Sequence, residues 1–288
     1  MKLTGRREST NVDDRRGKST ATGKAGLGIG GIVIIAIITW IMGGNPLDAL
    51  QNVDLSQMQA STTTEAYTPT AQEQELASFA KKILASTEDI WTSEFKKIGK
   101  TYQPPTLVLF SGNVQSGCGG ATAATGPFYC SADQCVYIDL SFFSSMKQQL
   151  GADGDFAYAY VIAHEVGHHV QHLLGTLDKA HAQMAKLSET ESNKISVQIE
   201  LQADYYAGVW GYHENATFRS LEDGDLEEAL QTAQVIGDDY LQKQARGYVV
   251  PESFNHGTSA QRLRWLKKGL TCGKITEGNT FSISYEEL

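Results

Sequence analysis

The pattern of apolar and polar residues divides the chain into three parts: an uncharged stretch near the start, a polar segment and a mixed C-terminal part. The stretch from Ala25 to Gly43 has no charged residue and contains an unbroken run of aliphatic side chains. A helix of this length is about 28 Å long, close to the thickness of a bilayer core. The pattern therefore predicts a transmembrane helix over residues 25–43.

Two other structures would fit such a stretch: a signal peptide that is cleaved, and a helix buried in a protein core. The stretch is long for a signal peptide, and no A-x-A-like cleavage site follows it. Residues 44–70 are rich in Ser, Thr, Gln and Asn and contain Pro46 and Pro69, which is typical of a flexible linker. We therefore favour an uncleaved single-span anchor, which makes the lipid bilayer a partner of the chain.

Residues 71–288 have the pattern of one α+β domain, mainly helical with a small sheet. Apolar positions at helical spacing predict a helix over 71–99, and a short apolar run predicts a strand over 106–110. A loop rich in Gly, Ala and Thr (111–127) leads to a strand or hairpin over 128–140. The strands of the sheet are therefore expected to precede most of the helices along the chain.

Helices fill the rest of the chain. They are expected over 154–174, 176–190, 192–213, 225 to about 246, and from 258 onward. The last two begin with capping-box patterns, Asp225-x-x-Glu228 and Thr258-x-x-Gln261.

Composition and charge narrow the classes of protein. The chain is 41% apolar and 20% charged, which is ordinary for a globular protein, and its net charge of −9 argues against a nucleic-acid partner. The charge is unevenly distributed, because residues 1–43 carry +4 and the remainder −13. Residues 1–24 are therefore expected to be a basic cytoplasmic stub, with everything after the anchor in the periplasm or outside the cell.

The four cysteines, Cys118, Cys130, Cys135 and Cys272, all follow the expected anchor. An even number in an oxidising compartment suggests two disulfides. Three pairings are possible, and the spacing does not choose among them. Free buried thiols are the alternative if the orientation across the membrane is different.

Residues 161–170 carry the strongest chemical signal, because they contain the pattern H-E-x-x-H. On a helix, His164 and His168 face the same side, a spacing that brings two imidazoles to one metal ion. Glu165 projects to one side of them, where it can take a proton from water activated by the metal. The alternative is a hydrogen-bonded pair of core histidines.

A catalytic zinc site needs a third protein ligand and an open position. The pattern H-E-x-x-H-x-x-G-x-x-H would supply a third His, but this chain has Gln171 and Leu174 at those positions. Residues 199–206 offer Glu200 as a ligand instead. Asp204, four residues later on the same helix face, can accept the free N–H of a ligand histidine. A solvated acidic pair is the alternative, against which the apolar neighbours argue.

Four segments together resemble one family of enzymes. They are GCGGATAATGPFYCSADQCVYIDLSFF, AHEVGHHVQHLLG, IELQADYYAGVW and FNHGTSAQRLRWLKKG. In this order they resemble the bacterial neutral zinc metallopeptidases, which carry a single N-terminal membrane anchor, over nearly the whole chain and most firmly over 71–288.

This resemblance implies a zincin-like fold with one catalytic Zn²⁺. It implies His164, His168 and Glu200 as ligands, Glu165 as general base and Asp204 as the residue that orients a ligand. It also implies that Cys118 pairs with Cys130, which would leave Cys135 and Cys272 as a second pair. The family does not supply a substrate.

These parts predict hydrolysis of peptide bonds by zinc-activated water, with Glu165 as general base. One further donor must stabilise the oxyanion. The candidates are Tyr206 and His256, which precedes the last helix in a segment similar to a stretch of related membrane metallopeptidases. An ordinary loop histidine is the alternative for His256. The strand over 129–138 is expected to be either an edge that pairs with a peptide substrate or an ordinary covered strand.

Two other functions fit the same ligands: a zinc hydrolase acting on a non-peptide amide, and a non-catalytic zinc-stabilised scaffold that binds partner proteins. The presence of Glu165 argues against the scaffold, because a structural zinc needs no general base. Mn²⁺ or Co²⁺ could occupy the same ligands. The sequence thus predicts a membrane-anchored zinc metalloendopeptidase whose domain faces the periplasm or exterior and whose partner is a protein or peptide substrate.

Overall fold

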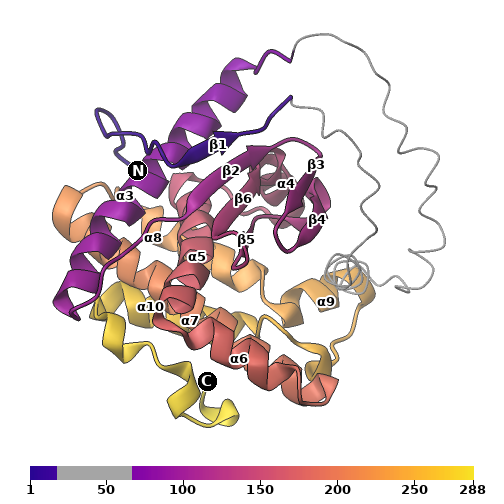
Figure 1. Ribbon diagram of the computed structural model, residues 1–288. Helices are drawn as coiled ribbons and strands as arrows, with labels where there is room; N and C mark the ends of the chain where they lie inside the picture. The colour runs from indigo at the N-terminus through magenta and orange to yellow at the C-terminus, as the bar shows by residue number, and fades with distance from the viewer. Residues whose placement is uncertain (18–66) are drawn as a thin grey trace.

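Two helices in the middle of the molecule, α5 (Asp155–Leu174) and α7 (Glu189–Phe218), pack against each other and carry the expected metal ligands. They belong to a computed structural model that describes residues 1–17 and 67–288 (Figure 1). The described part is mostly helical, with one four-stranded sheet and one two-stranded hairpin. The predicted α+β class, mainly helical with a small sheet, is confirmed.

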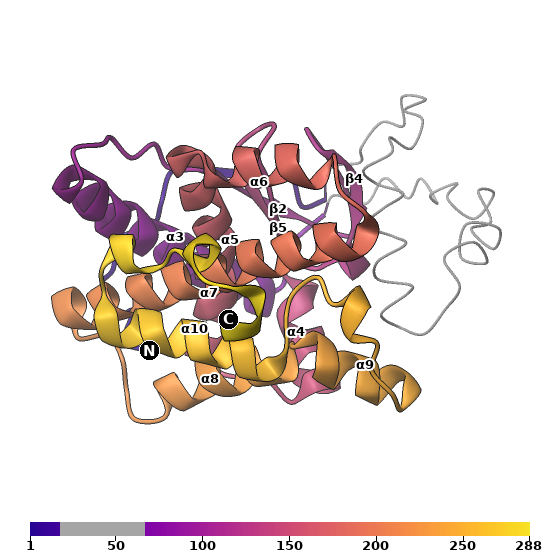
Figure 2. The ribbon, with the colours of Figure 1, turned by 90° about the horizontal axis from the view of Figure 1, so that it is seen from below.

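Small residues allow α7 to approach its neighbours closely. At the contact with α5, a Cβ placed on Gly167 would lie 2.9 Å from the carbonyl oxygen of Ala203. On the other side α10 (Ser259–Cys272) crosses α7, and a Cβ on Gly269 would lie 2.1 Å from the carbonyl oxygen of Tyr205. Figure 2 shows α7 between α5 and α6 on one side and α10 on the other. Because glycine has no side chain, the backbones come close enough for residues of α5 and α7 to share one site.

The four-stranded sheet has the order β1-β2-β6-β5. Three strands run parallel, namely β1 (Val12–Asp14), β2 (Thr106–Phe110) and β6 (Cys135–Asp139). The edge strand β5 (Phe128–Cys130) pairs antiparallel with β6 and contacts α5. The predicted strand over 106–110 and the hairpin over 128–140 are confirmed. The nearly continuous burial of β2 and β6 fits central strands that are covered on both faces.

Several helices agree with the sequence prediction. The first, α3 (Ala71–Lys97), begins with a capping box between Thr70 and Glu73, and α6 spans Thr176–Met184. The predicted capping box between Thr258 and Gln261 opens α10.

Two elements were not predicted. The segment 111–127, expected to be a loop, contains the hairpin of β3 (Asn113–Ser116) and β4 (Gly119–Thr122) and a short 3-10 helix (Ala123–Thr125). Helix α4 (Ser141–Leu150) follows β6. Both are short and, being poor in regularly spaced apolar residues, give little periodic signal.

The predicted helix over 225–246 is in fact two helices, α8 (Asp225–Val235) and α9 (Asp238–Arg246). A Cβ on Gly237, between them, would lie 2.3 Å from the backbone nitrogen of Ser259, so the chain bends where α10 begins. The capping box expected at Asp225 is also wrong. Gly224 is the N-cap, and the carboxylate of Glu228 accepts a hydrogen bond from the backbone N–H of Phe156 in α5 instead.

Residues 1–17, which we call the arm, were expected to form a stub separate from the domain, and this expectation is corrected. The arm supplies β1, and its Leu3 side chain is buried in the main core. The physical reason is that the basic side chains of the arm have acidic partners on the domain, among them Glu214 for Arg6 and Asp89 for Arg7. The domain therefore includes the arm as well as the segment from residue 67 onward.

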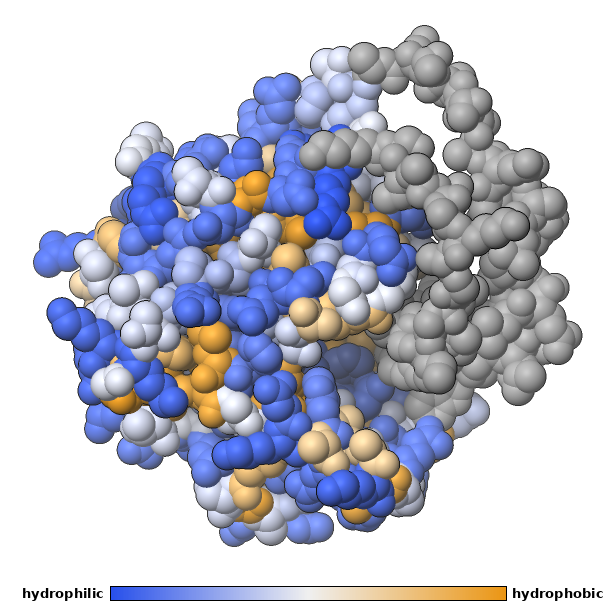
Figure 3. All heavy atoms as spheres, viewed as in Figure 1, coloured by the Kyte–Doolittle hydropathy of each residue, from blue (hydrophilic) through white to orange (hydrophobic). Residues whose placement is uncertain are grey.

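The predicted transmembrane helix over 25–43 and residues 44–66 of the predicted linker lie outside the described residues. No helix in the described part of the chain has the length and apolar character needed to cross a membrane. On the face shown in Figure 3, hydrophilic residues predominate, and hydrophobic ones are scattered among them.

One of the two expected disulfides is present. Cys118, between β3 and β4, is bonded to Cys130 of β5, which confirms that pair. The pair of Cys135 and Cys272 is wrong, because both are free thiols. Cys135 is buried with the β2–β6 residues of the sheet, whereas Cys272 ends α10 beside Tyr205 of α7.

Candidate metal centre

His164 and His168 lie one turn apart on α5, and Glu200 of α7 reaches both of them. Oε2 of Glu200 is 3.2 Å from Nε2 of His164, and Oε1 is 3.4 Å from Nε2 of His168. One potential ligand atom from each residue lies within 4.8 Å of the others. The structure therefore brings together the three ligands that the sequence predicts.

The geometry of this cluster fits a zinc ion. Zinc binds imidazole nitrogen and carboxylate oxygen at about 2.0–2.1 Å, so neighbouring donors of a tetrahedral site lie about 3.3 Å apart. The two separations between Glu200 and the histidines are close to that value. Two His and one Glu leave one tetrahedral position open, which is the arrangement of catalytic rather than structural zinc sites.

Asp204 holds His164 in place, as the sequence predicts. Its Oδ1 lies 2.8 Å from Nδ1 of His164, so that Nδ1–H donates to the carboxylate and Nε2 is left for the metal. Arg262 of α10 donates from Nε and Nη2 to the two oxygens of Asp204, each at 2.9 Å. The hydroxyl of Tyr160 donates to Oδ1 at 2.6 Å. A single carboxylate thus connects α5, α7 and α10 beneath the site.

The charges at this site favour a bound cation. Burial by itself raises the pKa of Asp204, but Arg262 and His164 lower it to about 2, so the group is an anion. Burial by itself lowers the pKa of His164, but Asp204 and Glu200 raise it to about 10 in the protein chain alone. The pocket therefore holds a positive charge on its imidazole, and a metal ion can replace that proton.

Gln171 is a partner of the site that the sequence analysis did not identify. Its side-chain oxygen lies 2.9 Å from Nδ1 of His168, so it orients this ligand as Asp204 orients His164. Its amide nitrogen donates to the carbonyl of Ile199, next to Glu200, and to Gln202. The i, i+3 spacing from His168 on α5 is the only sequence signal for this role.

Glu165 lies beside the cluster and is 8% exposed. Burial raises the pKa of its carboxyl group, while His168 and His164 oppose the shift. The backbone N–H of Tyr129 in β5 also lies near enough to lower the pKa of this carboxyl group. The group therefore lies against the edge strand and close to the ligands.

His169 connects α5 to this edge of the sheet. It is fully buried, with Nδ1 2.9 Å from the hydroxyl of Tyr129 and Nε2 2.6 Å from the carbonyl of Gln103. Burial lowers the pKa of His169 to about 4, so the ring is neutral near pH 7. His172 instead pairs with Asp178, at 3.2 Å.

The two candidates for oxyanion stabilisation lie in different surroundings. His256 faces Glu200 closely enough for their charges to interact, and Asp238 fixes it through contacts to Nδ1 (3.1 Å) and to its backbone N–H (2.7 Å). Burial lowers the pKa of His256, but Asp238 and Glu200 outweigh this, and the pKa is raised. Tyr206 is not brought to the cluster. Its ring packs edge-on against Trp91 of α3, with centroids 5.7 Å apart.

Comparison with known proteins finds one matching family and several related proteins. It matches the family described as "Putative neutral zinc metallopeptidase" over residues 1–281. It is 48% identical to "Uncharacterized protein YpfJ" of Escherichia coli (strain K12) over 292 residues, which cover 99% of this chain and 100% of that protein. It is 41% identical to "Uncharacterized protein Rv2575" of Mycobacterium tuberculosis (strain ATCC 25618 / H37Rv) over 209 residues, 68% of each chain. No solved structure matches it.

The family match includes the arm, the sheet and the whole metal centre. The ligand geometry and this match point to the same chemistry. The chain belongs to the neutral zinc metallopeptidase family.

Proposed function

We propose that this protein is an endopeptidase that uses one zinc ion held by His164, His168 and Glu200. The observation that carries the proposal is the buried carboxyl group of Glu165, which lies beside the three ligands and is not one of them. A zinc ion in this site would supply Lewis acidity, making water nucleophilic near neutral pH and polarising the substrate carbonyl. A site that only stabilised the fold would not need a buried carboxyl group in this position.

Glu165 acts as the general base in this proposal. Its carboxylate takes a proton from the attacking water and passes it to the leaving amine. The raised pKa of its carboxyl group suits both transfers, because a base that holds its proton moderately well also gives it up. The nearby N–H of Tyr129 favours the ionised form of the group between the ligands and the edge strand.

The edge strand β5 supports a peptide as the substrate. β5 is an outer strand of the sheet and lies against α5 beside Glu165. An extended peptide can add to such an edge through main-chain hydrogen bonds, with its carbonyl directed at the site. His256 is the proposed oxyanion donor, because Asp238 holds Nδ1 and leaves Nε2 for the substrate.

Replacing Glu165 by Gln tests this function. The Glu165→Gln protein should bind zinc as the parent protein does, because the side chain keeps its shape and is not a ligand. We expect kcat/KM on a peptide library to fall by about 10²–10⁴-fold, the usual contribution of a general base. Unchanged cleavage would contradict the assignment.

The same assay separates the other two functions. Activity on small amides with no activity on peptides would indicate a non-peptide amidase. A zinc-loaded parent protein without activity on either class would indicate a scaffold.

A further inference from the structure

The arm is bound to the domain by charges that are themselves buried. Glu214, near the end of α7, is completely buried, and Arg6 donates to its Oε1 at 2.7 Å. The remaining donors to Glu214 are the hydroxyls of Ser86 and Ser220. Without Arg6, this carboxylate would be a buried anion with no cationic partner, which is strongly unfavourable.

A second group of contacts involves Glu88 of α3. Arg7 donates to Glu88 at 2.9 Å and to Asp89 at 2.6 Å. Ser9 and the side chain of Asn11 donate to the other oxygen of Glu88, at 2.6 and 2.7 Å. Acidic residues of the domain thus have partners in the arm at several successive positions.

The backbone of the arm is also part of the sheet. β1 pairs with β2 from Val12 to Asp14, in register with residues 107–109. The N–H of Leu107 donates to the carbonyl of Asn11, and the N–H of Arg15 donates to the carbonyl of Leu109. Removing the arm would leave β2, a buried central strand, without hydrogen bonds along one edge.

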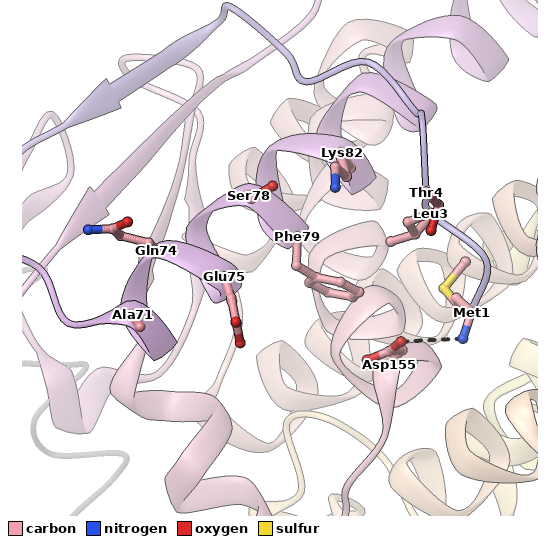
Figure 4. A pocket seen from close by; sticks show the side chains of 10 residues that line it. All are labelled: Met1, Leu3, Thr4, Ala71, Gln74, Glu75, Ser78, Phe79, Lys82 and Asp155. Carbon is pink, nitrogen blue, oxygen red and sulfur yellow. Dashed lines mark hydrogen bonds and ion pairs between the residues drawn. The ribbon is translucent and has the colours of Figure 1, made fainter.

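The first residues of the arm cover the side of α3. A pocket of about 550 Å³ lies between them. In Figure 4, Met1 and Leu3 lie on one side of this pocket and Phe79 of α3 on the other, with Asp155 of α5 bonded to Met1. The arm therefore contacts α3, α5, α7 and the sheet at the same time.

The chain leaves the arm and re-enters the domain at one place. A Cβ on Gly17 would lie 2.1 Å from Cβ of Tyr67, so the two described ends are in direct contact. Arg16 also donates to the carbonyl of Glu73 in the first turn of α3. The uncharged sequence from 25 to 43 lies within residues 18–66, which thus connect two segments that are fixed side by side. It is long enough for one crossing of a bilayer, about 28 Å, and too short for two.

We infer that the arm and the metal centre lie on the same side of any membrane. The basic residues Arg6 and Arg7 bind acids of the domain, rather than marking a cytoplasmic flank. The disulfide of Cys118 and Cys130 is typical of an exported domain, and the arm would share that compartment. This inference does not depend on the proposed catalytic activity.

Labelling of full-length protein in intact bacteria tests the inference. Single cysteines are introduced by Thr10→Cys in the arm and by Gln148→Cys in α4, both exposed positions, in a Cys272→Ser background. A membrane-impermeant maleimide is applied before and after the inner membrane is permeabilised. We expect both positions to react under the same condition. Reaction of one position before permeabilisation and of the other only afterwards would overturn the inference.

A crosslink tests the docking itself in the membrane fraction. The Ser78 hydroxyl donates to Glu8 at 2.5 Å, so a short, reducible bis-thiosulfonate reagent should bridge the thiols of the pair Glu8→Cys and Ser78→Cys. A protease site inserted within residues 44–66 then allows the arm fragment to be cut from the domain. On a denaturing gel the fragment should stay attached without reductant and be released with it, while Glu8→Cys alone should release it in both cases. Release of the fragment from the double variant without reductant would overturn the inference.

Discussion

Nδ1 of His164 lies 2.8 Å from Oδ1 of Asp204, and this bond joins the first ligand on α5 to the helix that carries the third. The same carboxylate is held by Arg262 of α10, so the orientation of the ligand depends on three helices. The metal centre is therefore supported by the packing of the domain core and not only by the H-E-x-x-H turn.

Asp204→Asn should weaken zinc binding. The change removes the negative charge that favours Nδ1–H of His164, and partners of this type usually contribute about 10–100-fold to metal affinity. It also leaves the buried guanidinium of Arg262 without its counter-charge, which we expect to lower the free energy of unfolding by about 3–5 kcal/mol. Zinc competition with a chelator and urea unfolding measure the two effects. The exposed acid of the same helix, changed in Glu191→Gln, should alter neither; an unchanged zinc Kd in Asp204→Asn would contradict the role.

Gln171→Leu should loosen the second ligand. Nδ1 of His168 loses its partner and the carbonyl of Ile199 loses a donor, so we expect zinc Kd to rise by about 10-fold. Unsatisfied buried groups should also cost about 1–3 kcal/mol of unfolding free energy. Gln149→Leu, at an exposed position of α4, is the matched control. If both variants bind zinc equally well, Gln171 does not orient the ligand.

Gly167→Ala should separate α5 from α7. In an unconstrained helix this substitution stabilises by about 1 kcal/mol, so a loss identifies the close approach to Ala203 as its cause. We expect a loss of about 1–3 kcal/mol in unfolding free energy, together with weaker zinc binding. A Cβ on Gly120 meets only a side-chain oxygen, at 3.5 Å, and Gly120→Ala should leave zinc binding unchanged. A more stable Gly167→Ala protein with normal zinc content would refute this explanation.

The zinc-free protein should lose stability as the pH falls from about 6.5 to 4, because of His169. Burial lowers its folded pKa from 6.5 to about 4, so in this window the unfolded chain takes up a proton that the folded protein does not bind. The full shift corresponds to roughly 3 kcal/mol. Urea unfolding at pH 7 and pH 4.5 measures the loss, and His169→Gln should show a clearly smaller one. Equal losses in the two proteins would mean that His169 does not cause the pH dependence.

Local spacing predicted the two parts of the candidate ligand set, and the family resemblance joined them. His164 and His168 face the same side because a helix repeats every 3.6 residues, and the same argument places Glu200 and Asp204 together on α7. Local spacing does not predict the role of Gln171, because this role depends on the carbonyl of Ile199, which comes from another helix. The surroundings of Tyr206 likewise depend on another helix, since the packing of α3 against α7 places its ring edge-on to Trp91.

The break between α8 and α9 shows the same limit of local patterns. The chain bends at Gly237, where Ser259, the first residue of α10, occupies the space that a side chain would need. Only glycine fits at this position. Nothing between residues 225 and 246 indicates that neighbour. Likewise, Glu228 has the spacing of a capping box with Asp225, yet it caps the start of α5.

The sequence by itself predicted the helical class of the domain and the residues proposed as metal ligands and general base, since the H-E-x-x-H pattern and the pair of Glu200 and Asp204 each lie within one or two turns of a helix. The tertiary structure alone decided where the basic N-terminal residues belong. Counted along the chain, Arg6 and Arg7 are a positive flank of an apolar stretch, and in the fold they neutralise Glu214 and Glu88. These partners lie 208 and 81 residues away along the chain, so no local pattern reveals them. A buried carboxylate without a cationic partner is unfavourable, and the carboxylate becomes buried only when the chain folds around it.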